Sequence, residues 1–306
     1  MKSFSFQVKE EILNNIGTKQ KAEAVLLGIL LFCRRFQAAN VNFVTENEAA
    51  SSFFMVNLAR ILKSEQVVQL EIMPKKDASL FVHRIRDRVS IASLRNFYGV
   101  SDLSKPVPDY ILKKPALLPA FTAGAFLACG SVNDPNKEYH FEFVVAEEAL
   151  ADAFATQLSE RFEIPLRKTV RRGSTVLYLK ESEFIEDMLT LMGATQSSLD
   201  LMNVKILKNV RNKINRAVNC DSANIEKTLR ASERQLADIA LIEAHGGFEA
   251  LPEDLREIAE LRAENPELNL KELGAALSTP ISRSGANHRL ERLARIAAEI
   301  RQRTGE

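Results

Sequence analysis

The spacing of apolar and polar positions changes several times along the first hundred residues, and each change predicts a helix or a strand. The helix at residues 47–65 is the clearest, because Phe54, Leu58 and Leu62 recur at helical spacing. Residues 41–46, VNFVTE, alternate as a strand does. The predicted elements, in order, are a helix at residues 21–33, a strand at 41–46, a helix at 47–65, strands at 66–74 and 79–87, and a short helix ending at Val100.

The same order of patterns then occurs a second time. Cys129 follows Cys33 by 96 residues and Gly193 follows Gly99 by 94, so the two passes keep a nearly constant offset. The segment that joins them, residues 104–119, contains four prolines and reads as a connection. This pattern predicts an α+β fold made of two copies of one unit, with helices covering sheets. The second pass comprises a helix at 121–129, a strand at 139–146, a helix at 147–162, strands at 164–172 and 174–182, and a helix at 183–194.

Arginines recur on the predicted strands. Alternation puts Arg84, Arg86 and Arg88 on one face of a strand, and Arg167 and Arg171 share a face on the matching strand of the second copy. A surface that faces DNA is one interpretation, and a sheet covered by a partner or by solvent is equally consistent. Nearby acids, Glu71 and Glu142, would cancel part of the positive field.

A basic stretch without any acid follows the second copy, at residues 202–219. On a helix, Lys205, Lys208, Asn212 and Arg216 would line one face, with Arg211 close by. Such a face is suited to contacts with DNA phosphates. A solvated linker helix explains the stretch equally well.

The remaining residues are helical in pattern. Helices are predicted at residues 224–244, 253–264 and 270–277, then a turn at 278–281 and a longer helix from Ser282 to about Arg303. Asn269, with Glu272 three residues on, is close to a capping box. A short helix, a tight turn and a longer basic helix indicate a helix-turn-helix (HTH). The predicted inner face comprises Leu270, Leu273, Ala276, Leu277, Ile281, Ala286, Leu290, Leu293 and Ala297.

The opposite face of the last helix has the residue types that recognise DNA. Arg283 can bind guanine and Asn287 can bind adenine through paired hydrogen bonds, whereas Arg292 and Arg295 are placed to reach phosphates. Ser282 is expected to cap the helix, whose N-terminus then favours a phosphate. The candidate DNA-binding residues are Ser282, Arg283, Ser284, Asn287, His288, Arg289, Arg292 and Arg295, together with Lys205, Lys208, Arg211 and Arg216 in the basic stretch.

Composition narrows the class of protein. The 306 residues carry a net charge of only +1, so DNA binding requires an uneven charge distribution. No apolar run is long enough for a bilayer span, and no export signal is evident at the N-terminus. Three scattered cysteines are too few for a disulfide framework and indicate a reducing cytoplasm. The cysteines and the isolated histidines do not have the spacing of metal ligands, so no metal site is expected. We expect a protein of the cytoplasm, at the nucleoid, with no cofactor and no small-molecule substrate.

Small residues in the first helix of each copy carry a resemblance to a known fold. TAGAFLACGS, residues 122–131, resembles the helix motif of LAGLIDADG homing endonucleases, and LLGILLFCRR, residues 26–35, is a more degenerate copy. In those enzymes an acid at each helix end holds the catalytic metal, whereas Cys33 and Cys129 stand there in this chain. A thiol is a poor Mg²⁺ ligand, so the resemblance implies nuclease architecture without nuclease chemistry. Buried packing is the simplest role for both cysteines, and a redox or metal pair is the alternative.

Longer stretches resemble the WhiA family over nearly the whole chain. These are GSVNDPNKEYHFEFV, NVRNKINRAVNCDSANIEKTL, LPEDLREIAELRAENPELNLKELG and ISRSGANHRLERL. The resemblance implies a degenerate LAGLIDADG domain joined to an HTH like that of sigma-factor region 4. It also implies roles in sporulation transcription, cell division and chromosome segregation.

The sequence therefore predicts a DNA-binding transcriptional regulator that is not an enzyme, in which the duplicated domain is a scaffold. Double-stranded DNA is the expected partner, with RNA polymerase, a sigma factor or another regulator as a further one. An active metal-dependent endonuclease and a nucleoid-associated cell-division protein without promoter control are the alternatives. The expected division is 1–105 and 106–200 for the two repeats, 201–223 for a basic linker helix, and 224–306 for the HTH domain.

Overall fold

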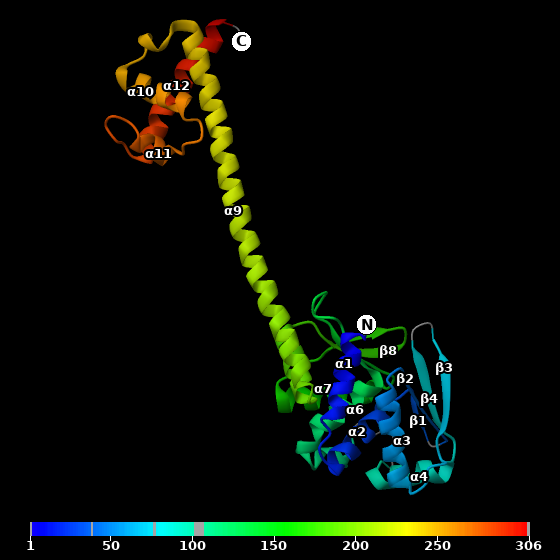
Figure 1. Ribbon diagram of the computed structural model, residues 1–306. Helices are drawn as coiled ribbons and strands as arrows, with labels where there is room; N and C mark the ends of the chain where they lie inside the picture. The colour runs from blue at the N-terminus through cyan, green and yellow to red at the C-terminus, as the bar shows by residue number, and fades with distance from the viewer. Residues whose placement is uncertain (1, 38, 76–77, 101–106, 305–306) are drawn as a thin grey trace. The chain divides into compact units, whose positions relative to one another are not determined.

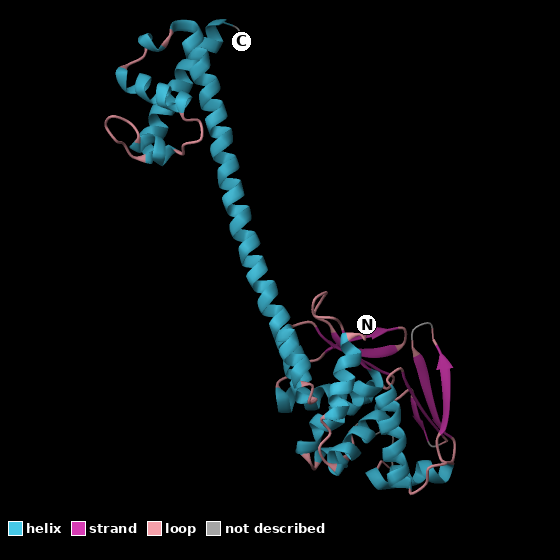
Figure 2. Cartoon of the chain, in the orientation of Figure 1, coloured by secondary structure: helices cyan, strands magenta, loops and turns pink. Residues whose placement is uncertain are grey.

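The computed structural model describes residues 2–37, 39–75, 78–100 and 107–304. The chain forms two compact units, residues 1–208 and residues 209–306. The first unit contains helices and two antiparallel sheets, and the second is helical (Figures 1 and 2). Among the described residues, no helix is both long and apolar enough to cross a bilayer.

The first unit contains the predicted duplication. Each copy has a four-stranded antiparallel sheet, of order β1-β2-β4-β3 in the first and β5-β6-β8-β7 in the second. The first copy comprises α2 (Lys19–Phe32), β1 (Arg35–Gln37), β2 (Asn40–Thr45), α3 (Glu48–Leu62), β3 (Gln69–Pro74), β4 (Ser79–Ile85) and α4 (Arg88–Tyr98). The second comprises α6 (Leu118–Cys129), β5 (Gly130–Val132), β6 (Phe141–Val145), α7 (Glu148–Phe162), β7 (Arg167–Arg171), β8 (Ser174–Leu179) and α8 (Ser182–Leu191).

Corresponding positions of the two copies match in detail. Helices α3 and α7 both end at a non-glycine residue in the left-handed conformation, Lys63 with φ 53° and Glu163 with φ 56°. Phe43 pairs with His83 in the first sheet, and Phe143 pairs with Leu177 in the second. The prediction of a duplicated α+β unit is therefore confirmed.

Helices α2 and α6 pack against each other at the centre of the unit and are buried over most of their length. Their approach is close because glycine faces glycine at the crossing. A Cβ atom on Gly28 would lie 2.2 Å from the carbonyl oxygen of Phe121, and one on Gly124 would lie 2.1 Å from that of Val25. The small residues in the sequence motif are thus explained by backbone contact.

Two further helices, α5 (Asp109–Leu112) and the 3₁₀ helix η1 (Pro115–Leu117), lie in the connection between the copies. The N-terminal helix α1 (Phe4–Asn14), which the sequence reading missed, buries Val8 and Ile12 in the same core. Its Glu11 carboxylate accepts hydrogen bonds from the backbone N–H groups of Gln196 (2.6 Å) and Ser197 (2.9 Å). Helix α1 therefore fixes the beginning of the long helix that starts at Thr195.

That helix, α9, is continuous from Thr195 to Gly246. The two helices predicted at residues 202–219 and 224–244 are one helix, which corrects the sequence reading. The reason is that residues 195–245 contain neither glycine nor proline, so no residue in this range breaks the helix.

The second unit continues with η2 (Phe248–Ala250), α10 (Glu253–Glu264), α11 (Leu270–Ala275) and α12 (Arg283–Thr304). Its core includes six of the nine residues predicted for the inner face, and Leu270 and Ile281 pack against it partly buried. Ala276 is exposed, contrary to the prediction. Arg262 is buried and donates hydrogen bonds to the carbonyl oxygens of Asn265, Pro266 and Leu268, so it fixes the loop after α10.

Candidate nucleic-acid interface

Helix α11, the turn after it and helix α12 have the order of an HTH. The Asn269 side chain accepts hydrogen bonds from the N–H groups of Lys271 (3.0 Å) and Glu272 (3.1 Å), and the Glu272 carboxylate accepts one from the Asn269 N–H (3.0 Å). The predicted capping box is therefore present, and it fixes the beginning of the short helix.

The turn between the two helices closes tightly. The Ile281 N–H donates to the carbonyl oxygen of Gly274 at 2.9 Å, and a Cβ on Gly274 would lie 2.7 Å from the Ile281 carbonyl oxygen. Gly285 faces the same residue, since its Cβ would lie 3.3 Å from Ile281 Cβ. The close approach at Gly285 is therefore to the turn itself.

Most predicted base-reading residues lie on the exposed side of α12. Ser282 Oγ accepts a hydrogen bond from the Gly285 N–H at 3.2 Å, so the predicted cap is formed. The exposed members of the predicted set are Ser282, Arg283, Ser284, Asn287, His288 and Arg295.

Arg289 and Arg292 are half-buried and contact Asp254 of α10. Arg292 Nη1 lies 2.9 Å from Asp254 Oδ2, and Arg289 Nη1 lies 3.3 Å from the Asp254 carbonyl oxygen. Next to them, the Glu257 carboxylate accepts a hydrogen bond from the Ser278 N–H, which lowers the pKa of Glu257. These acids hold α12 and the turn against α10, a structural role that the sequence did not reveal.

The four predicted cations of the basic stretch have different surroundings. Lys205 lies 2.7 Å from Glu183 and 3.3 Å from Glu186; its hydrogen bond lowers the pKa of Glu183 to about 2. Lys208 Nζ donates to the carbonyl oxygen of Pro135 at 2.6 Å and lies over the ring of Tyr139. Arg211 and Arg216 are exposed and, within the described part of the chain, form no ion pair. Lys205 and Lys208 therefore already have partners within the first unit.

Three strand arginines are paired with acids, and two of these acids, Glu71 and Glu142, are the ones that the sequence suggested would oppose them. Arg84 contacts Glu71, and Arg171 Nη2 lies 2.8 Å from Glu142 Oε1. Arg167 contacts Glu181. The predicted face of three arginines is wrong, because β4 ends at Ile85 and Arg88 begins α4, so Arg86 and Arg88 are not in the strand.

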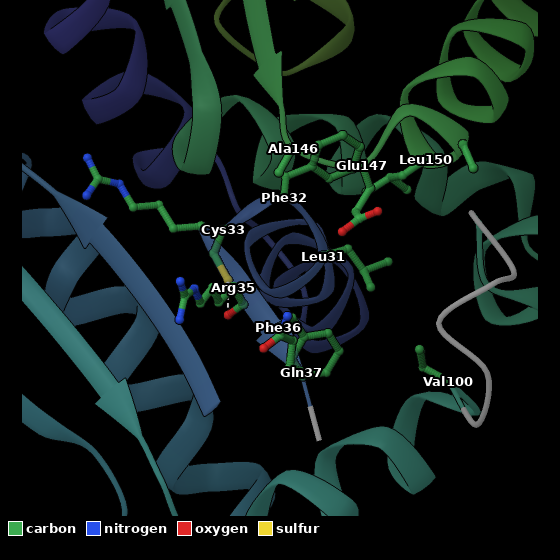
Figure 3. Close-up of a pocket in the computed structure, with 12 residues that line it drawn as sticks. Leu31, Phe32, Cys33, Arg35, Phe36, Gln37, Val100, Ala146, Glu147 and Leu150 are labelled. Carbon is green, nitrogen blue, oxygen red and sulfur yellow. Dashed lines mark hydrogen bonds between the residues drawn. The ribbon is translucent and has the colours of Figure 1, made fainter. Parts of the chain in front are cut away.

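Cys33 and Cys129, the two residues of the predicted degenerate nuclease site, lie at the ends of α2 and α6. Cys33 Sγ donates to the carbonyl oxygens of Leu30 and Arg35, both at 3.1 Å. Figure 3 shows Cys33 beside a pocket that residues of both repeats line, among them Leu31 of the first repeat and Glu147 of the second. Burial raises the pKa of each thiol to about 12, so both are neutral at pH 7. Neutral thiols are poor ligands for a divalent metal.

A lysine lies near Cys129, at the end of α6. Lys9 Nζ, from α1, is 3.5 Å from the carbonyl oxygen of Leu127 and 5.5 Å from the centroid of the Phe126 ring. Desolvation lowers its pKa to about 8, while the nearby Cys129 acts in the opposite direction. Across the described residues, no group of three or more His, Cys, Asp or Glu side chains is placed to hold a metal ion. The sequence signal for Lys9 was the apolar spacing of Phe4, Val8 and Ile12, which predicts a helix around it.

Comparison with known proteins agrees with both units. The family model described as "WhiA LAGLIDADG-like domain" matches residues 118–211, and the one described as "WhiA C-terminal HTH domain" matches residues 214–297. A "Probable cell division protein WhiA" from Clostridium acetobutylicum is 36% identical, covering 98% of this chain and 99% of its own. A protein of the same name from Clostridium botulinum is 37% identical with the same coverage.

Among solved structures, a full-length DUF199/WhiA from Thermatoga maritima matches with a TM-score of 0.57 and 27% identity. The match covers 97% of this chain and 99% of that chain. The fold and the matches place this chain in a class of proteins in which a LAGLIDADG-like domain precedes a helix-turn-helix domain. The chain belongs to the WhiA family.

Proposed function

We propose that this chain is a DNA-binding regulator that acts without cutting DNA. The exposed N-terminal half of α12, behind a capped short helix and a tight turn, carries the proposal. A helix of this kind fits the major groove, where Arg and Asn side chains recognise bases. Its natural partner is double-stranded DNA. We expect the chain to act in the cytoplasm, at the nucleoid.

The role of the duplicated domain is that of a scaffold. The ends of α2 and α6 carry two neutral thiols, and the ammonium group of Lys9 lies where a nuclease would need carboxylates and a divalent cation. The strand arginines are balanced by acids, which weakens any positive field on the sheets. We expect this domain to bind a protein partner, such as RNA polymerase, a sigma factor or another regulator.

Two experiments test the proposal. Full-length protein should bind a subset of duplexes from a genomic library, and its sites in cells should lie at promoters whose transcripts change on deletion. Residues 1–208, which form a compact unit, should bind duplex DNA far more weakly at low salt. Equal binding by this fragment would move the interface to the duplicated domain.

A second candidate is a cell-division protein that binds DNA without controlling promoters. Two relatives are named as probable cell-division proteins, which is the observation that favours it. Binding sites spread along the chromosome, with unchanged transcripts and a division defect on deletion, would support this candidate. Sporulation and chromosome segregation are roles that the same deletion strain would test.

A further inference from the structure

The outward face of α12 contains an acid that the DNA-binding set does not include. The buried row of this helix is Ala286, Leu290, Leu293 and Ala297. Each residue two positions earlier is rotated by about 200°, so it points away from the core. These outward residues are Ser284, His288, Glu291 and Arg295, and all four are exposed. Glu291 therefore lies at the centre of the surface proposed to face DNA.

A carboxylate at this position needs a reason, because phosphates repel it. The nearby arginines do not provide one: Arg289 and Arg292 lie against Asp254 of α10. Arg295, four residues after Glu291, forms no ion pair with it in the part of the chain that the structure describes. Glu291 instead accepts a hydrogen bond from the amide of Asn287, with Nδ2 2.8 Å from Oε1. One oxygen of the carboxylate holds Asn287, and the other is available to an outside donor.

Among the groups that bases expose in the major groove, the 4-amino group of cytosine is a donor that glutamate accepts. The Asn287 amide, held by Glu291 through one N–H, still has its second N–H and its carbonyl oxygen. Those two groups are the pair that binds adenine N7 and N6.

We propose that Glu291 is a specificity-determining residue that selects cytosine, and that it orients Asn287 to read adenine at a nearby base pair. The inference rests on the proposed function, because it requires α12 to enter the major groove. It adds an acid to the reading surface and names a base preference for it.

Selection from a randomised duplex library tests this with full-length wild-type protein and the Glu291→Ala and Glu291→Gln variants. The wild type should enrich a site with cytosine at one position, and Glu291→Ala should lose preference there alone. Glu291→Gln should enrich adenine at that position, because glutamine pairs with adenine. Glu299→Gln removes an exposed negative charge from the same helix and should keep the wild-type site.

A second measurement removes the amino group instead of the side chain. In the selected duplex, the cytosine is replaced by pyrimidin-2-one, which lacks the 4-amino group. Wild-type affinity should fall by about 5- to 150-fold, the usual range for one wrong base pair. Glu291→Ala should bind both duplexes equally.

The outcomes separate the inference from the proposed function. If Glu291→Ala keeps the cytosine preference, or the pyrimidin-2-one duplex binds the wild type with unchanged affinity, the role proposed for Glu291 is wrong. The proposal that α12 recognises DNA is not affected by either result. If the wild type enriches no sequence at all, specific DNA reading fails and this inference fails with it. Circular dichroism of each variant checks that α12 remains folded.

Discussion

Gly28 of α2 and Gly124 of α6 lie against each other where the two central helices cross: a Cβ atom on either would come within 2.9 Å of the other's Cα. The neighbouring carbonyl oxygens are closer still, so even a methyl group requires the backbones to separate. This contact brings the C-terminal ends of α2 and α6, with Cys33 and Cys129, close together. The close packing of the two helices therefore requires glycine at both positions.

Gly124→Ala should destabilise the first unit by about 1–3 kcal/mol or more, because added atoms at a packed crossing force the helices apart. Urea unfolding followed by circular dichroism measures the change. Gly17→Ala is the matched control, since a Cβ at Gly17 has no neighbour within 4 Å. Equal stability of the two variants would contradict the close contact.

Purified protein should not cleave plasmid or linear duplex DNA with Mg²⁺ or Mn²⁺. The reason is that Cys33 and Cys129, both neutral at pH 7, stand at the two positions where the resemblance to the endonucleases places metal-binding carboxylates. Gel assays over several hours check this. Metal-dependent cleavage that is lost in Cys33→Ser or Cys129→Ser would show that the site is active.

The three cysteines should differ strongly in reactivity. Cys220 is exposed, whereas burial raises the pKa of Cys33 and of Cys129 to about 12. The thiolate is the reactive form, so iodoacetamide at pH 8 should modify Cys220 first and the other two slowly. Mass spectrometry of digested protein measures each site, and the same reaction in urea should modify all three.

His83 should make the first repeat less stable in acid. Burial lowers the pKa of His83 below its ordinary 6.5, and its Nε2 lies 2.8 Å from Ser51 Oγ. Below pH 6.5 the unfolded chain binds a proton that the folded chain excludes. The free energy of unfolding should therefore fall with falling pH, by up to about 1.4 kcal/mol per pH unit.

The second repeat supplies the matched variant for this test. Leu177 occupies the position of His83, and the buried Ala151 lies one hundred residues after Ser51, at the corresponding position of α7. The double variant Ser51→Ala/His83→Leu should remove this part of the pH dependence while it keeps the core filled. An unchanged slope of stability between pH 5 and pH 7 would assign the effect to other groups.

On a specific duplex, Arg283→Ala and Asn287→Ala should each cost about 1–3 kcal/mol and relax the base preference. Both side chains are exposed near the beginning of α12. Arg295→Ala should weaken all sequences similarly and flatten the salt dependence, because a phosphate contact carries no base information. Fluorescence anisotropy at several salt concentrations distinguishes the two classes of residue. Unchanged preference in folded Arg283→Ala and Asn287→Ala proteins would rule out this recognition helix.

Arg292 is a less suitable position than Arg295 for testing phosphate contact. The sequence predicted phosphate contact for both, but Arg292 lies 2.9 Å from Asp254. Its replacement by alanine would therefore also loosen α12 from α10, and it is a less clear test of DNA binding. The predicted DNA-binding set as a whole stays a prediction until such variants are measured.

The sequence by itself determined the two repeated units, the inner row of α12 and the cap at Asn269. These features depend on residue spacing within one helix or strand, and periodicity encodes them locally. The small residues around Gly28 and Gly124 also predicted close packing of two helices. The continuous helix α9 could also have been predicted from the sequence, because residues 195–245 contain neither glycine nor proline.

Only the tertiary structure decided which side chains meet across long stretches of chain. Lys9 lies beside the end of α6, Glu11 caps the backbone at Ser197, and Asp254 holds Arg292. Charges on the strands were visible in the sequence, but their neutralisation by Glu71, Glu142 and Glu181 required the register of the sheets and the ends of their strands. The physical reason is that an ion pair or a cap depends on distance in space, which residue spacing fixes only over one or two turns of a helix.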